Sequence, residues 1–189
     1  MQFSHKLMYD NFTKSDCDVV VRLFKDKNII LTQSKNVKKF ESTWSKWLGV
    51  KYSVFVNSGS SANLLTISIL KILYKKGEII LPSLTWVSDI NSVIQNGFKP
   101  VFVDINPYTL NVDTEKIENS ITEKTKVLLP VHFGGLSCDI DKINSLSKKY
   151  NLKIIEDAAH AAGTSYKNKK IGSHGNAVCF SFHPIKNLA

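Results

Sequence analysis

Short runs of branched apolar residues recur along the chain, and each run is bounded by Gly, Pro, Asn or Asp. Runs of this kind are typical of strands that are buried on both faces of a parallel sheet. The runs that fit this description are 53–56, 78–81, 101–105, 126–131, 153–155 and 178–182.

Between these runs, apolar residues follow the three- and four-residue spacing that predicts amphipathic helices. The predicted helices are 37–48, 60–73, 86–95, 114–120 and 140–150. Residues typical of helix starts and ends agree with these predicted helices, because Lys76-Gly77 fits a helix end and Asp113-Thr114 fits a helix start. Strands that alternate with helices predict an α/β fold on a mainly parallel sheet flanked by helices.

The charge balance invites a nucleic-acid hypothesis, because 25 basic residues face 16 acidic ones and the formal net charge is +9. Arg22 is the only arginine, however, and the lysines are scattered among acids, as Lys38, Lys39 and Lys46 are around Glu41. Base readout and phosphate recognition favour arginine. We therefore predict that nucleic acid is not a partner.

Cysteine usage and hydropathy bear on the compartment. Cys17, Cys138 and Cys179 are odd in number and far apart, which supports neither a disulfide framework nor a zinc site. No apolar run approaches the roughly 20 residues of a membrane-spanning helix. The first residues also lack the apolar stretch of a secretion signal. These features predict a cytoplasmic protein without a membrane span or a metal.

Candidate binding residues follow the predicted strands, because ligands of parallel α/β sheets bind beyond the carboxyl ends of the strands. Gly59 and Ser60 lie in a small-residue turn that opens a helix, which suits a phosphate or, alternatively, an ordinary serine cap. Trp86 follows the second run and either stacks on an aromatic ligand or simply packs.

Candidate acid–base residues follow the last two runs. A carboxylate such as Asp157 at a buried strand end needs a cationic partner, unless it caps a helix. His160 comes three residues later and is either a neighbour of Asp157 or an ordinary polar residue. Ser181 and Lys186 place a hydroxyl and an amine five residues apart at the end of the last run. A lysine near an apolar pocket becomes a nucleophile toward a carbonyl, whereas a lone lysine is usually a surface residue.

Together these signals form a recognisable set. A phosphate cradle, a flat aromatic ring, a carboxylate for a ring nitrogen and a lysine for an aldehyde are what pyridoxal phosphate requires. The carboxylate keeps the pyridine nitrogen protonated, which makes the ring an electron sink. The sequence thus predicts a Schiff-base cofactor site.

The segments SGSSANLL, LPSLTWVS, KPVFVDI, LPVHFGG, IIEDAAHAAG and FSFHPIKN occur in this order. They resemble the DegT/DnrJ/EryC1/StrS family of sugar aminotransferases, which are fold-type-I pyridoxal phosphate enzymes. The resemblance implies an N-terminal arm or helical segment over 1–32 and a partial cofactor-binding large domain over 33–189. Within the family, the chain is most similar to enzymes that aminate the 4-keto group of nucleotide-linked deoxysugars or pentoses.

The resemblance implies catalytic roles for three residues. Lys186 would form the Schiff base with the cofactor and shuttle a proton between the sugar carbon and the cofactor carbon. Asp157 would bind the pyridinium nitrogen. His160 takes a position near the ring hydroxyl of the cofactor, where its role would be supportive.

The resemblance also implies the cofactor-binding residues. Gly59 and Ser60 match the phosphate-binding turn, and Ser181 matches a serine whose hydroxyl binds the same phosphate. Trp86 falls where the family stacks an aromatic ring on the cofactor.

The implied reaction transfers an amino group from L-glutamate to a keto group of a nucleotide-linked sugar, for cell-surface polysaccharide or lipopolysaccharide synthesis. One branch of the family instead removes the C3 hydroxyl of a keto-sugar and has a histidine in place of the lysine. Lys186 therefore favours transamination over dehydration. An inactive fragment or binding remnant is a further alternative.

The resemblance leaves part of the family pattern unmatched. Family members are roughly twice as long as one domain, so the rest of the large domain and the small C-terminal domain are expected to be absent. We expect either a homodimer, if the protein is complete, or pairing with a separately encoded C-terminal half. An unfinished sheet would expose apolar surface and an open edge.

Overall fold

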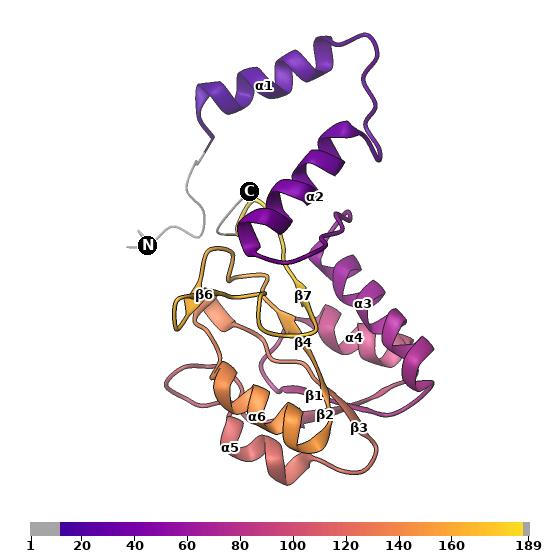
Figure 1. Ribbon diagram of the computed structural model, residues 1–189, viewed down its shortest axis with the longest axis vertical. Coiled ribbons are helices and arrows are strands. Elements are labelled where there is room, and N and C mark those ends of the chain that lie inside the picture. Colours follow the sequence, from indigo (N-terminus) through magenta and orange to yellow (C-terminus); the bar gives the residue numbers. More distant parts are fainter. Residues whose placement is uncertain (1–11, 187–189) are drawn as a thin grey trace, which may run out of the picture. The chain divides into compact units, whose positions relative to one another are not determined.

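The computed structural model describes residues 12–186 (Figure 1). The chain divides into two compact units, Met1–Phe55 and Val56–Ala189. The elements of the second unit are α3 (Gly59–Tyr74), β1 (Glu78–Pro82), α4 (Val87–Gln95), β2 (Lys99–Val103), α5 (Thr114–Ile117), η1 (Glu118–Ser120), β3 (Thr125–Leu128), η2 (Phe133–Gly135), α6 (Ile140–Tyr150), β4 (Lys153–Asp157), β5 (Ser165–Tyr166), β6 (Lys169–Lys170) and β7 (Ala177–Cys179).

The first unit contains two helices, α1 (Lys14–Lys25) and α2 (Lys35–Leu48). Thr13 and Asp16 cap the start of α1 reciprocally, each accepting a hydrogen bond from the backbone N–H of the other. The end of α2 is Gly49, whose φ of 83° is a left-handed conformation that glycine adopts without strain.

The predicted strand at 53–56 is wrong, because the structure contains no strand there. The backbone N–H of Phe55 donates instead to the carboxylate of Glu41, at 2.8 Å. Val54 is 80% exposed, so the apolar run is not buried as the prediction required. A strand needs a neighbouring strand for its backbone groups, and the local pattern of the run cannot provide one.

The other five predicted strands form one sheet in the order β2-β1-β3-β4-β7. All four pairings are parallel. The carboxyl ends of the strands therefore lie at one edge of the sheet, and the segments that follow them come together there. The last strand is shorter than predicted, since β7 ends at Cys179 and residues 180–182 lie beyond the sheet.

Helices cover the sheet in two layers (Figure 1). Side chains of successive strand residues point to opposite faces, so Ile79 packs with α3 and α4 while Ile80 packs with α5 and α6. The predicted helices agree with α2 to α6, except that the short helix at 114–120 changes to a 3₁₀ helix at Glu118. The sequence therefore predicts the α/β layers correctly.

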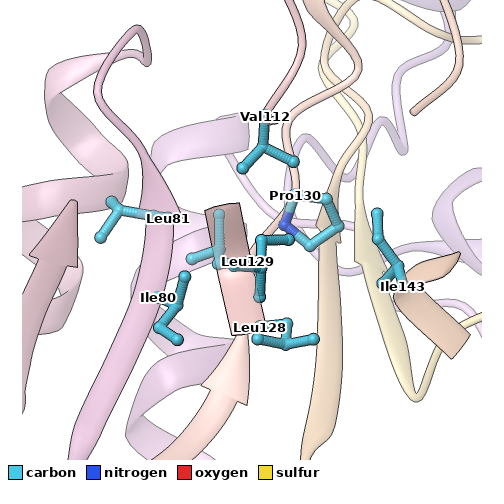
Figure 2. A pocket seen from close by; sticks show the side chains of 8 residues that line it. Ile80, Leu81, Val112, Leu128, Leu129, Pro130 and Ile143 are labelled. Carbon is cyan, nitrogen blue, oxygen red and sulfur yellow. The ribbon is translucent and has the colours of Figure 1, made fainter. Parts of the chain in front are cut away.

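A small cavity lies on the α6 side of the sheet, among apolar side chains from β1, β3 and α6 (Figure 2). Its volume is about 10 Å³, which is close to the space of one water molecule. Ile80, Leu128 and Ile143 are among its lining residues. This face of the sheet is thus a packed core, and the space for a ligand has to be sought at the strand ends.

Candidate active site

The helix α3 begins beside the segment that follows β7. Ser58 caps the helix by accepting a hydrogen bond from the backbone N–H of Ser61, at 3.1 Å. A Cβ placed on Gly59 would lie 3.1 Å from Cβ of Ser181 and 3.2 Å from the carbonyl oxygen of Phe180. The structure thus brings Gly59, Ser60 and Ser181 together at a helix N-terminus, where free N–H groups favour an anion.

Lys186 lies against His160. The Nζ atom of Lys186 is 2.8 Å from Nε2 of His160, and both side chains are half-buried. The other ring nitrogen, Nδ1, accepts a hydrogen bond from the backbone N–H of Gly134 at 3.3 Å. With Nδ1 accepting, the proton of a neutral ring is on Nε2, the nitrogen that faces Nζ of Lys186.

His160 is held neutral by its surroundings. Burial and then the positive charge of Lys186 lower the pKa of His160, and the negative charge of Asp157 opposes this change. The ring therefore titrates below the usual range of histidine and is available to exchange a proton with Lys186. The structure places His160 at the lysine amine, and its position near the ring hydroxyl of the cofactor stays a prediction.

Asp157 ends β4 and is buried. Its Oδ1 accepts a hydrogen bond from the backbone N–H of Ala159 at 2.8 Å, and its Oδ2 accepts one from Nδ2 of Asn63 at 3.0 Å. Because Asp157 is paired with Cys179 across β4 and β7, the carboxylate and the segment leading to Lys186 leave the sheet at the same edge. Asp157 and the segment that carries Lys186 therefore lie at the same edge of the sheet, as a Schiff-base site requires.

A second carboxyl group lies next to Asp157. Asp89 on α4 is fully buried, its Oδ1 accepts Nδ2 of Asn63 at 2.5 Å, and its Oδ2 is hydrogen-bonded to the hydroxyl of Thr85. Burial and then repulsion from the Asp157 carboxylate raise the pKa of Asp89 to about 8, and a hydrogen bond between the two carboxyl groups acts in the same direction, although the bond to Thr85 opposes this change.

Asn63 and Asp89 are not among the residues predicted from the sequence, although a signal existed for each. Asn63, Ile67 and Leu70 follow helical spacing and are all buried, so Asn63 is a polar residue on the apolar face of its helix. Asp89 is a buried acid in a short helix whose other buried residues include Val93. A polar group on a buried helix face needs a partner, and that requirement points toward a site.

Trp86 precedes the first residue of α4, and its side chain is 70% exposed. The neighbouring residue Thr85 is hydrogen-bonded to Asp89, so the indole is attached to the turn that contacts Asp89. An exposed aromatic ring at this position is accessible to a flat ligand.

A separate polar network links β4 with two loops of the second unit. Nε2 of His132 is 3.0 Å from Oε2 of Glu156, and both side chains are buried. The backbone N–H of Gly175 donates to Oε1 of Glu156 at 2.8 Å, and the backbone N–H of Cys138 donates to Nδ1 of His132 at 3.1 Å. Glu156 thereby connects β4 with the loops that follow β3 and precede β7.

A membrane-spanning helix and a metal-binding cluster are both absent from residues 12–186. Within this part of the chain, no helix combines the length and the apolar character of a membrane-spanning segment. The same residues contain no group of three or more His, Cys, Asp or Glu side chains that could hold a metal ion.

Fold and site together define a fold-type-I pyridoxal phosphate transferase domain. Residues 13–189 match the DegT/DnrJ/EryC1/StrS aminotransferase family, and the chain belongs to this family. The spore coat polysaccharide biosynthesis protein SpsC of Bacillus subtilis is 43% identical over 159 residues, which are 84% of this chain and 41% of SpsC.

Solved structures of related enzymes have the same fold. Helicobacter pylori PseC, an aminotransferase involved in the biosynthesis of pseudoaminic acid, superimposes with a TM-score of 0.91 at 32% identity, over 97% of this chain and 49% of PseC. The E. coli GDP-4-keto-6-deoxy-D-mannose-3-dehydratase with bound hydrated PLP gives a TM-score of 0.85 at 31% identity, over 93% of this chain and 46% of the dehydratase. The chain thus spans about half the length of these relatives.

Proposed function

We propose that this chain contributes the cofactor-binding part, residues 33–189, of a pyridoxal phosphate-dependent aminotransferase that moves an amino group from L-glutamate to a keto group of a nucleotide-linked sugar. Family membership and the PLP-bound E. coli relative support pyridoxal phosphate as the cofactor. Similarity to SpsC supports a role in cell-surface polysaccharide synthesis. The cytoplasmic location and the homodimer stay predictions from the sequence.

The observation that carries this proposal is the convergence of an amine and a carboxylate on one histidine. Lys186 contacts His160 directly, and the charge of Asp157 acts on the same ring. The residues also fit the phosphate end of the cofactor, because a side chain at Gly59 would fill the space beside Ser181. A lysine, a buried carboxylate and an anion-binding turn match the aldehyde, the ring nitrogen and the phosphate of pyridoxal phosphate.

Each residue then has a defined task. Bound pyridoxal phosphate supplies an aldehyde carbon that carries the amino group and a ring that withdraws electrons. Lys186 would hold the cofactor covalently and move a proton at Nζ, while His160 would exchange a proton with that atom. Asp157 would keep the ring nitrogen protonated, and the N–H groups near Ser60 would bind the phosphate.

Transamination is favoured over dehydration by the amine itself. A lysine can both hold the cofactor and return a proton to the carbon that becomes aminated. The alternative, a keto-sugar dehydratase on the same fold, is represented among the structural relatives. Detection of a deoxygenated sugar in place of an amino sugar would support that alternative.

The proposal predicts that purified protein mixed with pyridoxal phosphate gains the visible absorption of a protonated Schiff base. Addition of L-glutamate should then convert the bound cofactor to its amine form and remove this absorption, whereas D-glutamate should not. Absorption spectra and mass analysis of the released cofactor measure both steps. A spectrum that shows only free cofactor would contradict the proposal.

A second prediction concerns the phosphate end. In Gly59→Val, the new side chain would meet Ser181 and the carbonyl of Phe180, since even a Cβ there approaches them to 3.1 and 3.2 Å. We expect affinity for pyridoxal phosphate to fall by about tenfold or more, because the added side chain would push Ser181 away and obstruct the N–H groups that would bind the phosphate. Pyridoxal, which lacks the phosphate, is the matched control ligand, and its affinity should change little in a fluorescence titration.

A further inference from the structure

Two buried carboxyl groups share one amide donor in this site. Nδ2 of Asn63 donates to Oδ2 of Asp157 and to Oδ1 of Asp89. The remaining donors to these carboxyl groups are the backbone N–H of Ala159 and the hydroxyl of Thr85, and none of the donors carries a charge. Two adjacent buried carboxylates repel each other strongly, so the pair retains one proton.

The hydrogen bonds of the cluster also require one more proton. Within residues 12–186, Oδ1 of Asn63 is buried without a hydrogen-bond partner. Both amide hydrogens of Asn63 are engaged by the two carboxyl groups. The cluster therefore has more acceptors than donors, and an added proton on a carboxyl group reduces this excess.

The partners of each carboxyl group decide which one holds the proton. Asp157 faces two N–H groups, from Ala159 and Asn63, which donate and cannot accept. Asp89 faces one N–H group and the hydroxyl of Thr85, whose oxygen can also accept a hydrogen bond. A protonated Asp89 can therefore donate to Thr85 or to the Asp157 carboxylate that contacts it, whereas the other groups that contact Asp157 are donors.

We propose that Asp89 is a positioning residue that retains a proton at neutral pH and, through Asn63, keeps Asp157 ionised and oriented toward the ring nitrogen of the cofactor. This inference rests on the proposed function for the identity of the ligand. The raised pKa of Asp89 agrees with it. Asp89 acts on the cofactor only through Asp157.

Other titratable groups near Asp89 do not take over this role. Asp157 approaches from β4, and Cys179 approaches from β7. Burial raises the pKa of Cys179 to about 12, so its thiol stays neutral. From α3, the group that contacts Asp89 is the amide of Asn63. Asp89 and Asp157 are thus the pair whose charges compete.

The pair predicts how stability changes with pH. The pKa of Asp89 is raised from 3.8 to about 8, so its protonated form stabilises the fold fully below pH 3.8. This contribution is lost as the pH rises toward 8, where the folded protein must ionise Asp89. In Asp89→Asn the loss is absent. A rise from pH 5 to pH 8 should therefore lower the melting temperature of the wild type more than that of this variant. Thermal unfolding at the two pH values measures the difference.

The test compares three variants in the full chain, with and without pyridoxal phosphate. Asp89→Asn imitates the protonated acid, because its oxygen accepts from Asn63 and its nitrogen donates to Thr85. It should retain cofactor affinity within about threefold of the wild type. Asp89→Leu removes the acceptor of Asn63 and should weaken cofactor binding by about tenfold or more. In Asp157→Asn the side-chain nitrogen would face the N–H groups of Ala159 and Asn63, so this variant should still form the Schiff base but bind the cofactor more than about threefold more weakly than the wild type.

Infrared difference spectra supply a readout that needs no cofactor. The wild type at pH 7 should show the C=O stretch of a buried carboxylic acid, which disappears as the pH rises through about 8 and is absent in Asp89→Asn. A missing band in the wild type, or a band that persists in Asp89→Asn, would overturn the inference. If the band behaves as expected but no Schiff base forms, the proposed function fails and the protonated Asp89 stands.

Discussion

Lys186→Ala is expected to abolish the Schiff-base absorption and to reduce amino transfer from L-glutamate to below about one hundredth of the wild-type rate. The variant lacks the amine that holds the cofactor and the atom that moves the proton. Nothing else at this position can replace it, because the neighbouring His160 has a ring nitrogen that exchanges protons but forms no stable Schiff base. Cofactor spectra and single-turnover rates measure the two losses separately.

Surface lysines also react with pyridoxal phosphate, so the experiment needs a matched lysine. Lys148 is exposed in the last turn of α6, on the helix that covers the sheet. Lys148→Ala should behave like the wild type in both measurements. If Lys186→Ala and Lys148→Ala give the same spectrum as the wild type, Lys186 is not the reactive amine.

Asp157→Asn is expected to retain the Schiff base but to lose about 100-fold in the rate of amino transfer, which corresponds to about 2.7 kcal/mol of activation free energy. The amide cannot keep the ring nitrogen protonated, so electron withdrawal by the ring is lost. The side-chain nitrogen of the new asparagine would also face the two N–H groups that donate hydrogen bonds to Asp157 in the wild type. Stopped-flow measurement of the reaction with L-glutamate gives the rate.

Asp141 provides the control for this loss of charge. It is an exposed residue of α6 that forms an ion pair with Lys167, and exposed pairs contribute little to stability. Asp141→Asn should react at the wild-type rate. An Asp157→Asn protein that also reacts at the wild-type rate would refute the role of the carboxylate at the ring nitrogen.

Most of the fold could be predicted from local patterns, because each buried strand and each amphipathic helix carries its own periodicity. The run at 53–56 shows the limit of this approach. Its composition is that of a strand, but a strand also needs a neighbour, and the N–H of Phe55 is bonded to Glu41 instead. Pairing is a property of the whole chain and is not written in any one run.

The same distinction applies to the site. Gly59, Asp157 and Lys186 could be proposed because parallel strands deliver the residues that follow them to one edge of the sheet. Asn63 and Asp89 could not be proposed, because their importance arises from long-range contacts. Asn63 contacts Asp89, which is 26 positions away in sequence, and Asp157, which is 94 positions away. Their polar character on buried helix faces indicated only that a partner exists.

The short strand β7 has a consequence for motion. Within residues 12–186 it is one of the two edge strands of the sheet, it has three residues, and the segment that carries Ser181 and Lys186 follows it directly. Short edge strands open locally at a lower free energy than central strands. The segment that carries Lys186 should therefore open before β4, which carries Asp157. A ligand bound to both Lys186 and Asp157 would hold the two segments together and slow amide hydrogen exchange along β7.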